Sequence, residues 1–169
     1  MGSILEMVGQ GGRKQTIQRL FLRNIQRGLV TLPPLFQDLV RDVYESEGGG
    51  GETVSQVAVC LVCGEKIARI SSGSVLSYRP CVSHARSCGA GLGIFLLLSK
   101  SSVMLVQDLW VAHWGSPFLD QYGEEDFGLL RGHKLFLDAA RYSSLNELWN
   151  SQNLRRWNAN KWKKVEAIP

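Results

Sequence analysis

The segments Cys60-Leu-Val-Cys63-Gly64 and Cys81-Val-Ser-His84-Ala-Arg-Ser-Cys88-Gly89 contain all four cysteines of the chain and one of its three histidines. Thiolate and imidazole are preferred ligands of structural zinc, and two cysteines separated by two residues are typical of such sites. Gly64 allows the tight turn that directs both sulfurs of the first pair to one point. Residues 60–88 therefore predict one structural zinc site.

The second segment offers three ligands for the two remaining positions of a tetrahedral site. On a helix, His84 and Cys88 lie four residues apart on one face, and Cys81 shares that face because it lies three residues before His84. Our preferred set is Cys60, Cys63, His84 and Cys88, and the alternative replaces Cys88 with Cys81. A catalytic metal is disfavoured because Glu65 is the only acid within the cluster.

Length and composition favour one domain with flanking arms. The chain has 169 residues, 44% of them hydrophobic, which supports a core of modest size. Cysteines at metal spacing and the absence of a signal peptide imply a reducing compartment, so we expect a cytoplasmic or nuclear protein. The longest apolar run, residues 92–98, is too short to cross a bilayer and indicates a buried strand instead.

The net charge of +4 is concentrated at the C-terminal end. The last residues carry one acid, Glu166, against Arg155, Arg156, Lys161, Lys163 and Lys164. Basic residues interleaved with Trp157 and Trp162 could bind nucleic acid, or the tryptophans could dock on the domain while the lysines stay in water. Because the rest of the chain is close to neutral, we favour docking and consider nucleic acid an improbable partner.

The hydrophobic pattern predicts an α+β fold. Helical spacing is expected over 13–27, 35–45, 82–88 and 139–151, with Asp138 capping the last helix. Short hairpins are expected over 54–70 and 94–106, with further strands at 109–114 and 135–137 and a polar loop over 116–132. The organisation is then a disordered lead (1–12), a helical arm (13–45), a glycine-rich acidic linker (46–53), a zinc domain (54–152) and a basic tryptophan-containing tail (153–169).

Three other patterns are assigned structural roles. Gly89-x-Gly91-x-Gly93 precedes a strand, which is the reverse of a dinucleotide-binding loop, so we expect close backbone packing beside the metal. The acidic loop Tyr122-Gly-Glu-Glu-Asp126 is expected to pair with nearby cations such as Arg131. His113 and His133 have no partner at ligand spacing and are expected to be packing or loop residues.

Taken together, these motifs resemble the C-terminal domain of the UBR-family E3 ubiquitin ligases, the N-recognins of the N-degron pathway, including the plant Proteolysis-6 type. Besides the two cysteine segments, the resemblance rests on Leu32-Pro33-Pro34, on Trp114-Gly-Ser-Pro117-Phe-Leu-Asp120, on Arg131-Gly132-His-Lys-Leu135-Phe-Leu137, and on Arg141-Tyr142 and Leu148-Trp149. Leu130 and Lys134 depart from the pattern, and the basic tail has no counterpart in it.

The resemblance implies a structural and interaction domain that carries one zinc within a large ligase. Its partners would be the RING and helical scaffold of that ligase, with a ubiquitin-conjugating enzyme as a further partner and no membrane. No catalytic residues are expected, because the cysteines are too few for a UBR box or a RING in addition. The alternatives are a stand-alone zinc finger that uses the basic tail on nucleic acid, and a compact RING-like module that recruits a ubiquitin-conjugating enzyme.

Overall fold

The computed structural model describes residues 28–46, 56–70 and 74–165. The expected disordered lead, the helix over 13–27 and most of the linker lie outside these residues. The described part combines helices with antiparallel sheet, which confirms the α+β class. None of its helices is long and apolar enough to span a membrane.

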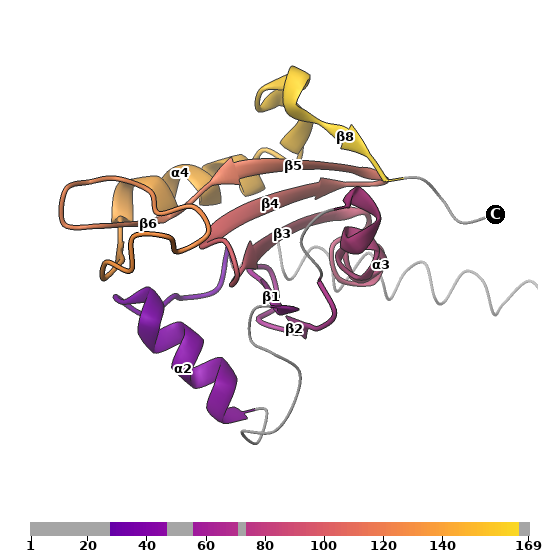
Figure 1. Ribbon diagram of the computed structural model, residues 1–169. Helices are drawn as coiled ribbons and strands as arrows, with labels where there is room; N and C mark the ends of the chain where they lie inside the picture. The colour runs from indigo at the N-terminus through magenta and orange to yellow at the C-terminus, as the bar shows by residue number, and fades with distance from the viewer. Residues whose placement is uncertain (1–27, 47–55, 71–73, 166–169) are drawn as a thin grey trace, which may run out of the picture.

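A six-stranded antiparallel sheet forms the centre of the fold (Figure 1). Its strands lie in the order β2-β1-β3-β4-β5-β8. They are β1 (Ala58–Cys60), β2 (Lys66–Ile67), β3 (Leu92–Leu97), β4 (Ser102–Gln107), β5 (Trp110–Gly115) and β8 (Lys163–Lys164). Strands β3 and β4 are the expected second hairpin, and every residue of both is buried except Leu92 and Gln107, which are half-buried. A continuous apolar run of this length is typical of a strand covered on both faces.

Helix α3 (Arg79–Cys88) packs against β3 and β4. Pro80 lies in its first turn, where the missing N–H of proline costs no hydrogen bond, so the helix begins earlier than the 82–88 predicted from the sequence. Before α3, the 3-10 helix Val75–Tyr78 is capped by Ser74, whose hydroxyl oxygen accepts from the Leu76 N–H at 3.2 Å. The 3-10 helix and the first turn of α3 together place residues 81–88 beside the first pair of cysteines.

Helix α4 (Ala139–Asn150) closes the other side of the core with Leu145 and Trp149, which are fully buried. The Asp138 carboxylate accepts from the Arg141 N–H at 2.8 Å, so the N-cap predicted at this residue is confirmed. The sequence therefore placed this helix to within one residue at its C-terminal end.

Helix α2 (Phe36–Ser46) joins the core through a small second sheet of β6 (Phe118–Leu119) and β7 (Phe136–Leu137). The ring centroids of Phe36 and Phe118 are 5.3 Å apart in an edge-to-face arrangement. Upstream of α2, the Val30 N–H donates to the Leu61 carbonyl at 2.8 Å. Residues 28–46 of the predicted arm thus pack directly on the zinc-domain segment, and strand β6 lies in what was predicted to be a polar loop.

The segment after α4 completes the sheet. Strand β8 pairs with β5, with Lys163 opposite Val111, and Figure 1 shows it in yellow along that edge. Trp162 is buried, and its indole N–H donates to the Trp157 carbonyl at 3.0 Å. Lys163 and Lys164 are exposed. This is the docked arrangement that the sequence favoured for the tail.

Candidate metal centre

The turn between β1 and β2 holds the first pair of cysteines. Cys60 ends β1, and its N–H donates to the Glu65 carbonyl while its carbonyl accepts from the Gly64 N–H, both at 2.8 Å. Gly64 has a φ of +84°, a left-handed conformation that other residues adopt only at a cost. The turn therefore needs this glycine to bring Cys63 back over Cys60.

Helix α3 supplies the other two candidate ligands. His84 and Cys88 are one helical turn apart, and the imidazole of His84 packs edge-to-face on Phe95 of β3, with ring centroids 5.8 Å apart. That contact fixes the direction of the ring. Cys81 is fully buried elsewhere on the helix and does not belong to the group.

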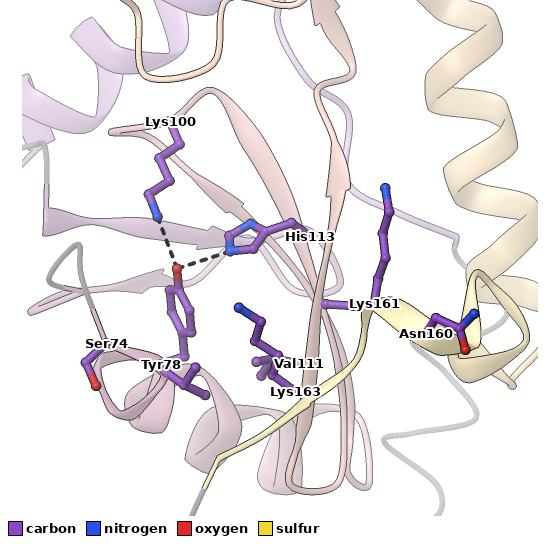
Figure 2. Close-up of a pocket in the computed structure, with 10 residues that line it drawn as sticks. Ser74, Tyr78, Lys100, Val111, His113, Asn160, Lys161 and Lys163 are labelled. Carbon is purple, nitrogen blue, oxygen red and sulfur yellow. Dashed lines mark hydrogen bonds between the residues drawn. The ribbon is translucent and has the colours of Figure 1, made fainter.

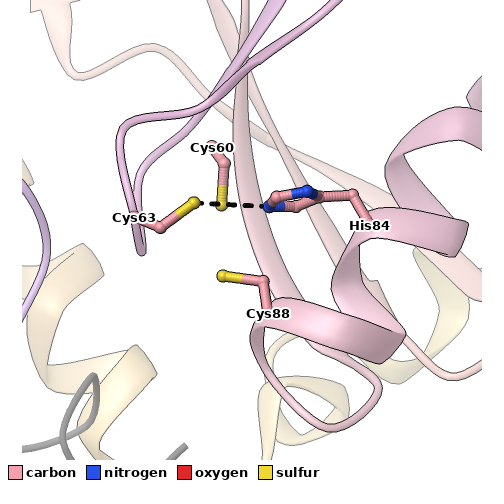
Figure 3. Close-up of side chains that lie close together, drawn as sticks. All are labelled: Cys60, Cys63, His84 and Cys88. Carbon is pink, nitrogen blue, oxygen red and sulfur yellow. Dashed lines mark hydrogen bonds between the residues drawn. The ribbon is translucent and has the colours of Figure 1, made fainter. Parts of the chain in front are cut away.

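The four side chains Cys60, Cys63, His84 and Cys88 converge (Figure 3), with their ligand atoms all within 4.8 Å of one another. The Cys63 Sγ lies 3.4 Å from the His84 Nε2. A tetrahedral zinc with bonds of about 2.3 Å to sulfur and about 2.0 Å to nitrogen requires ligand atoms roughly 3.5–3.8 Å apart. The Cys63–His84 separation matches this requirement, and three thiols with one imidazole are a ligand set typical of structural zinc.

The electrostatics of the cluster favour a negative sulfur beside a positive ring. Hydrogen bonds from Cys60 and Cys88 lower the pKa of Cys63, and hydrogen bonds to Cys63 and Cys88 raise the pKa of His84 to about 10. Cys81 differs, because burial alone raises the pKa of its thiol to about 12. The cluster thus stabilises the Cys63 thiolate that a metal needs, and a bound metal ion would displace the proton from the Nε2 of His84, whereas Cys81 lies where a thiolate is disfavoured.

Glu65 orients the histidine from behind. Its Oε2 lies 3.5 Å from the Nδ1 of His84, the ring nitrogen that faces away from the cluster. A carboxylate near Nδ1 favours the tautomer that carries its proton there and leaves Nε2 free for a metal. Sequence reasoning noticed Glu65 only as the one acid of the segment, because its spacing from His84 gives no signal of contact.

The glycines after α3 bring backbone and core close to the cluster. A Cβ on Gly89 would lie 2.0 Å from the Leu92 carbonyl oxygen, and a Cβ on Gly93 would lie 2.5 Å from the ring of Phe95 and 3.0 Å from the Cβ of Ala85. Close packing, the role predicted for Gly89-x-Gly91-x-Gly93, is therefore confirmed.

The remaining polar motifs have structural partners. Arg131 contacts the acidic loop through Glu124 and Asp126 and lies 3.3 Å from buried Asp120. His133 contacts Asp120 at 3.2 Å, and His113 contacts the Tyr78 hydroxyl at 3.2 Å. Among the described residues, no second group of cysteine, histidine and acid side chains is placed to hold a metal.

Comparison with known proteins points to one family. The family profile described as Proteolysis_6 C-terminal matches residues 8–151. The chain is 36% identical to the E3 ubiquitin-protein ligase PRT6 of Arabidopsis thaliana over 129 residues, which are 76% of this chain and 6% of that protein. It is 40% identical to human UBR3 over 105 residues (59% of this chain, 6% of UBR3) and 30% identical to human UBR2 over 134 residues (75% and 8%). Both are also named E3 ubiquitin-protein ligases, and the chain spans less than a tenth of the length of each relative.

Proposed function

The chain belongs to the Proteolysis_6 C-terminal family of UBR-type ligases, and we propose that it serves as the structural and interaction domain of an E3 ubiquitin ligase of the N-degron pathway. The observation that carries this proposal is the cluster of four candidate metal ligands. Its four candidate ligands come from the β1–β2 turn and from α3, so they tie the two segments that flank β3. In this role the domain positions other parts of a ligase, and the transfer of ubiquitin occurs elsewhere.

The metal in this proposal is one structural zinc. Cys60, Cys63, His84 and Cys88 would hold it, with Glu65 orienting His84. When bound, such an ion supplies folding free energy by cross-linking the two segments. Four protein ligands leave no open position for substrate or water, which is why we assign no catalytic step to the site.

The partners in this proposal are the RING and helical scaffold of the ligase, with a ubiquitin-conjugating enzyme reached through them. Large apolar side chains at the surface support a role in protein contacts. Among them, Tyr44 of α2 is 53% exposed and lines one pocket with the partly exposed Leu129. Free thiols at a metal site suit a reducing compartment, so we assign the domain to the cytoplasm or the nucleus.

The two alternatives are less well supported by the fold. A nucleic-acid-binding tail needs its tryptophans free for stacking, but Trp162 is buried and Trp157 is half-buried against the core. A RING-like module would need more ligands than the single cluster found among the described residues.

A binding experiment tests the interaction role. The chain, as wild type and as the Cys88→Ala and Cys81→Ala variants, is immobilised and offered RING-bearing fragments of a UBR-type ligase. We expect capture by the wild type and by Cys81→Ala, and loss of capture by Cys88→Ala, because Cys88 belongs to the metal cluster and Cys81 does not. Equal capture by all three proteins would contradict a role for the metal-ordered surface.

A ubiquitin-transfer assay tests the absence of chemistry in this chain. With an E1 enzyme, a panel of E2 enzymes and ubiquitin, we expect no chain formation by the isolated protein. Robust transfer that is lost in Cys88→Ala would favour the RING-like alternative instead.

A further inference from the structure

A basic pocket of about 590 Å³ lies where the C-terminal segment meets the turn before α3. Its polar lining comprises seven side chains, which are Ser74, Tyr78, Lys100, His113, Asn160, Lys161 and Lys163. Figure 2 shows Lys100 and Lys163 extending toward the pair formed by Tyr78 and His113, whereas Lys161 extends away from that pair. The volume falls within the range of about 300–1,000 Å³ that is typical of small-molecule sites.

The charge of this pocket is unbalanced. No carboxylate lines it among the described residues, and none of the ion pairs found there involves Lys100, Lys161 or Lys163. Like charges gathered in one concave surface repel one another and raise the local potential for anions. Burial lowers the pKa of His113 to about 4, and the positive charges of Lys100 and Lys163 act in the same direction.

Lys100 is held in position by aromatic rings and a hydroxyl. Its ammonium donates to the Tyr78 hydroxyl at 3.2 Å and lies 5.9 Å and 5.8 Å from the ring centroids of Tyr78 and Phe127. The Tyr78 hydroxyl can in turn donate to the His113 Nε2, 3.2 Å away, since His113 is neutral near pH 7. An ammonium has three donors, so this arrangement leaves Lys100 able to bind a ligand as well.

We propose that this pocket binds the dianionic group of a phosphate monoester, held between Lys100 and Lys163. A phosphate monoester carries about −1.5 to −2 charges at neutral pH and presents three acceptor oxygens, which balances two ammonium groups. A carboxylate would balance only one. The space beyond the two ammonium groups accommodates the moiety to which the phosphate is esterified.

The chain provides a matched control for this proposal. Lys163 and Lys164 are neighbours on β8, both exposed, but successive side chains of a strand point to opposite faces and only Lys163 lines the pocket. Replacing either by alanine removes one positive charge from the same strand. A difference between Lys163→Ala and Lys164→Ala therefore reports the site and not the net charge.

The test is a calorimetric titration at pH 7 with three probes: inorganic phosphate, a short phosphoserine peptide and the same peptide without phosphate. We expect wild type and Lys164→Ala to bind the phosphorylated probes with a Kd of about 1 mM or tighter, and Lys163→Ala and Lys100→Ala to bind about tenfold more weakly. Tighter binding of the peptide than of inorganic phosphate would identify a phosphorylated protein segment as the source, and equal binding would identify a free phosphate compound.

Three outcomes would overturn the proposal. The first is the absence of saturable binding of inorganic phosphate and of the phosphoserine peptide by the wild type. The second is an equal response of Lys163→Ala and Lys164→Ala, and the third is equal binding of the peptides with and without phosphate, because either would show nonspecific attraction to a basic surface. Metal content is measured in every sample, so loss of phosphate binding is distinguished from damage to the metal centre.

Discussion

Substituting Cys88 and Cys81 separately distinguishes a metal centre from ordinary packing. Both residues lie on α3, and both substitutions to alanine remove one sulfur atom. Cys81 is 0% exposed and Cys88 is half-buried, so packing alone predicts that Cys81→Ala is the more damaging change. A metal held by Cys88 reverses that order.

The magnitudes separate the two explanations clearly. A structural zinc contributes about 10–16 kcal/mol on binding, so loss of one ligand of four removes about 2.5–4 kcal/mol and weakens metal binding by two to three powers of ten. Deleting the buried Cys81 sulfur costs about 1 kcal/mol, comparable with the loss of one buried methyl group. Because a whole domain has a stability of about 5–15 kcal/mol, only the first change threatens the fold.

The assay combines metal per chain by elemental analysis with urea unfolding, each with and without a chelator. We expect Cys81→Ala to keep its metal and Cys88→Ala to lose it, with the unfolding midpoint of Cys88→Ala the lower of the two. In excess chelator, the order of the midpoints should invert, because only the packing term remains. Metal loss from Cys81→Ala together with retention in Cys88→Ala would refute the ligand set, and no metal in folded wild type would refute the site.

Three further changes test other parts of the reasoning. Glu65→Gln should weaken metal binding by less than about tenfold in a chelator competition, since the carboxylate is 65% exposed, whereas Glu147→Gln on α4 should have no effect. Gly89→Ala should lower the free energy of unfolding by about 1–3 kcal/mol, because the Leu92 carbonyl oxygen must move. The control is Gly123→Ala, which adds only backbone strain of about 1 kcal/mol and should therefore lower stability less in urea unfolding. An equal loss of stability in the two variants would contradict the packing role of Gly89. The pKa of His113 is about 4 when folded and 6.5 when unfolded, so the unfolded chain binds the extra proton between these values and stability falls as pH falls through that window. Wild type should therefore lose more stability than His113→Gln between pH 7 and pH 5, and parallel losses would argue against a buried neutral imidazole.

The long apolar and helical elements were predictable from sequence because each carries its own pattern. Strands β3 and β4 and helices α2 and α4 lie within about two residues of their predicted bounds. Strand β7 lies within the strand predicted at 135–137, but β6 and β8, which have only two residues each, were not predicted. So short a strand is defined by its partner, and Lys163-Lys164 in particular has no apolar residue that could indicate pairing.

The metal centre shows a similar limit. Spacing alone brought five candidate ligands together but could not choose between Cys81 and Cys88, because both share a helical face with His84. The choice depends on how α3 is rotated against β3, which the contact between His84 and Phe95 determines. Which of the candidates bind a metal stays a prediction until the metal is measured.

The pairing of β8 with β5 changes how deletion mapping of this protein should be interpreted. The family match ends at residue 151, so a truncation placed just beyond it would look natural. Such a truncation would uncover the hydrogen-bonding edge of β5 and remove the buried side chains of Leu154, Trp162 and Val165. A free strand edge beside a fresh apolar surface promotes self-association. Loss of partner binding by a shortened protein would then reflect aggregation, and point substitutions at exposed Lys163 and Lys164 are the safer way to assign a role to this segment.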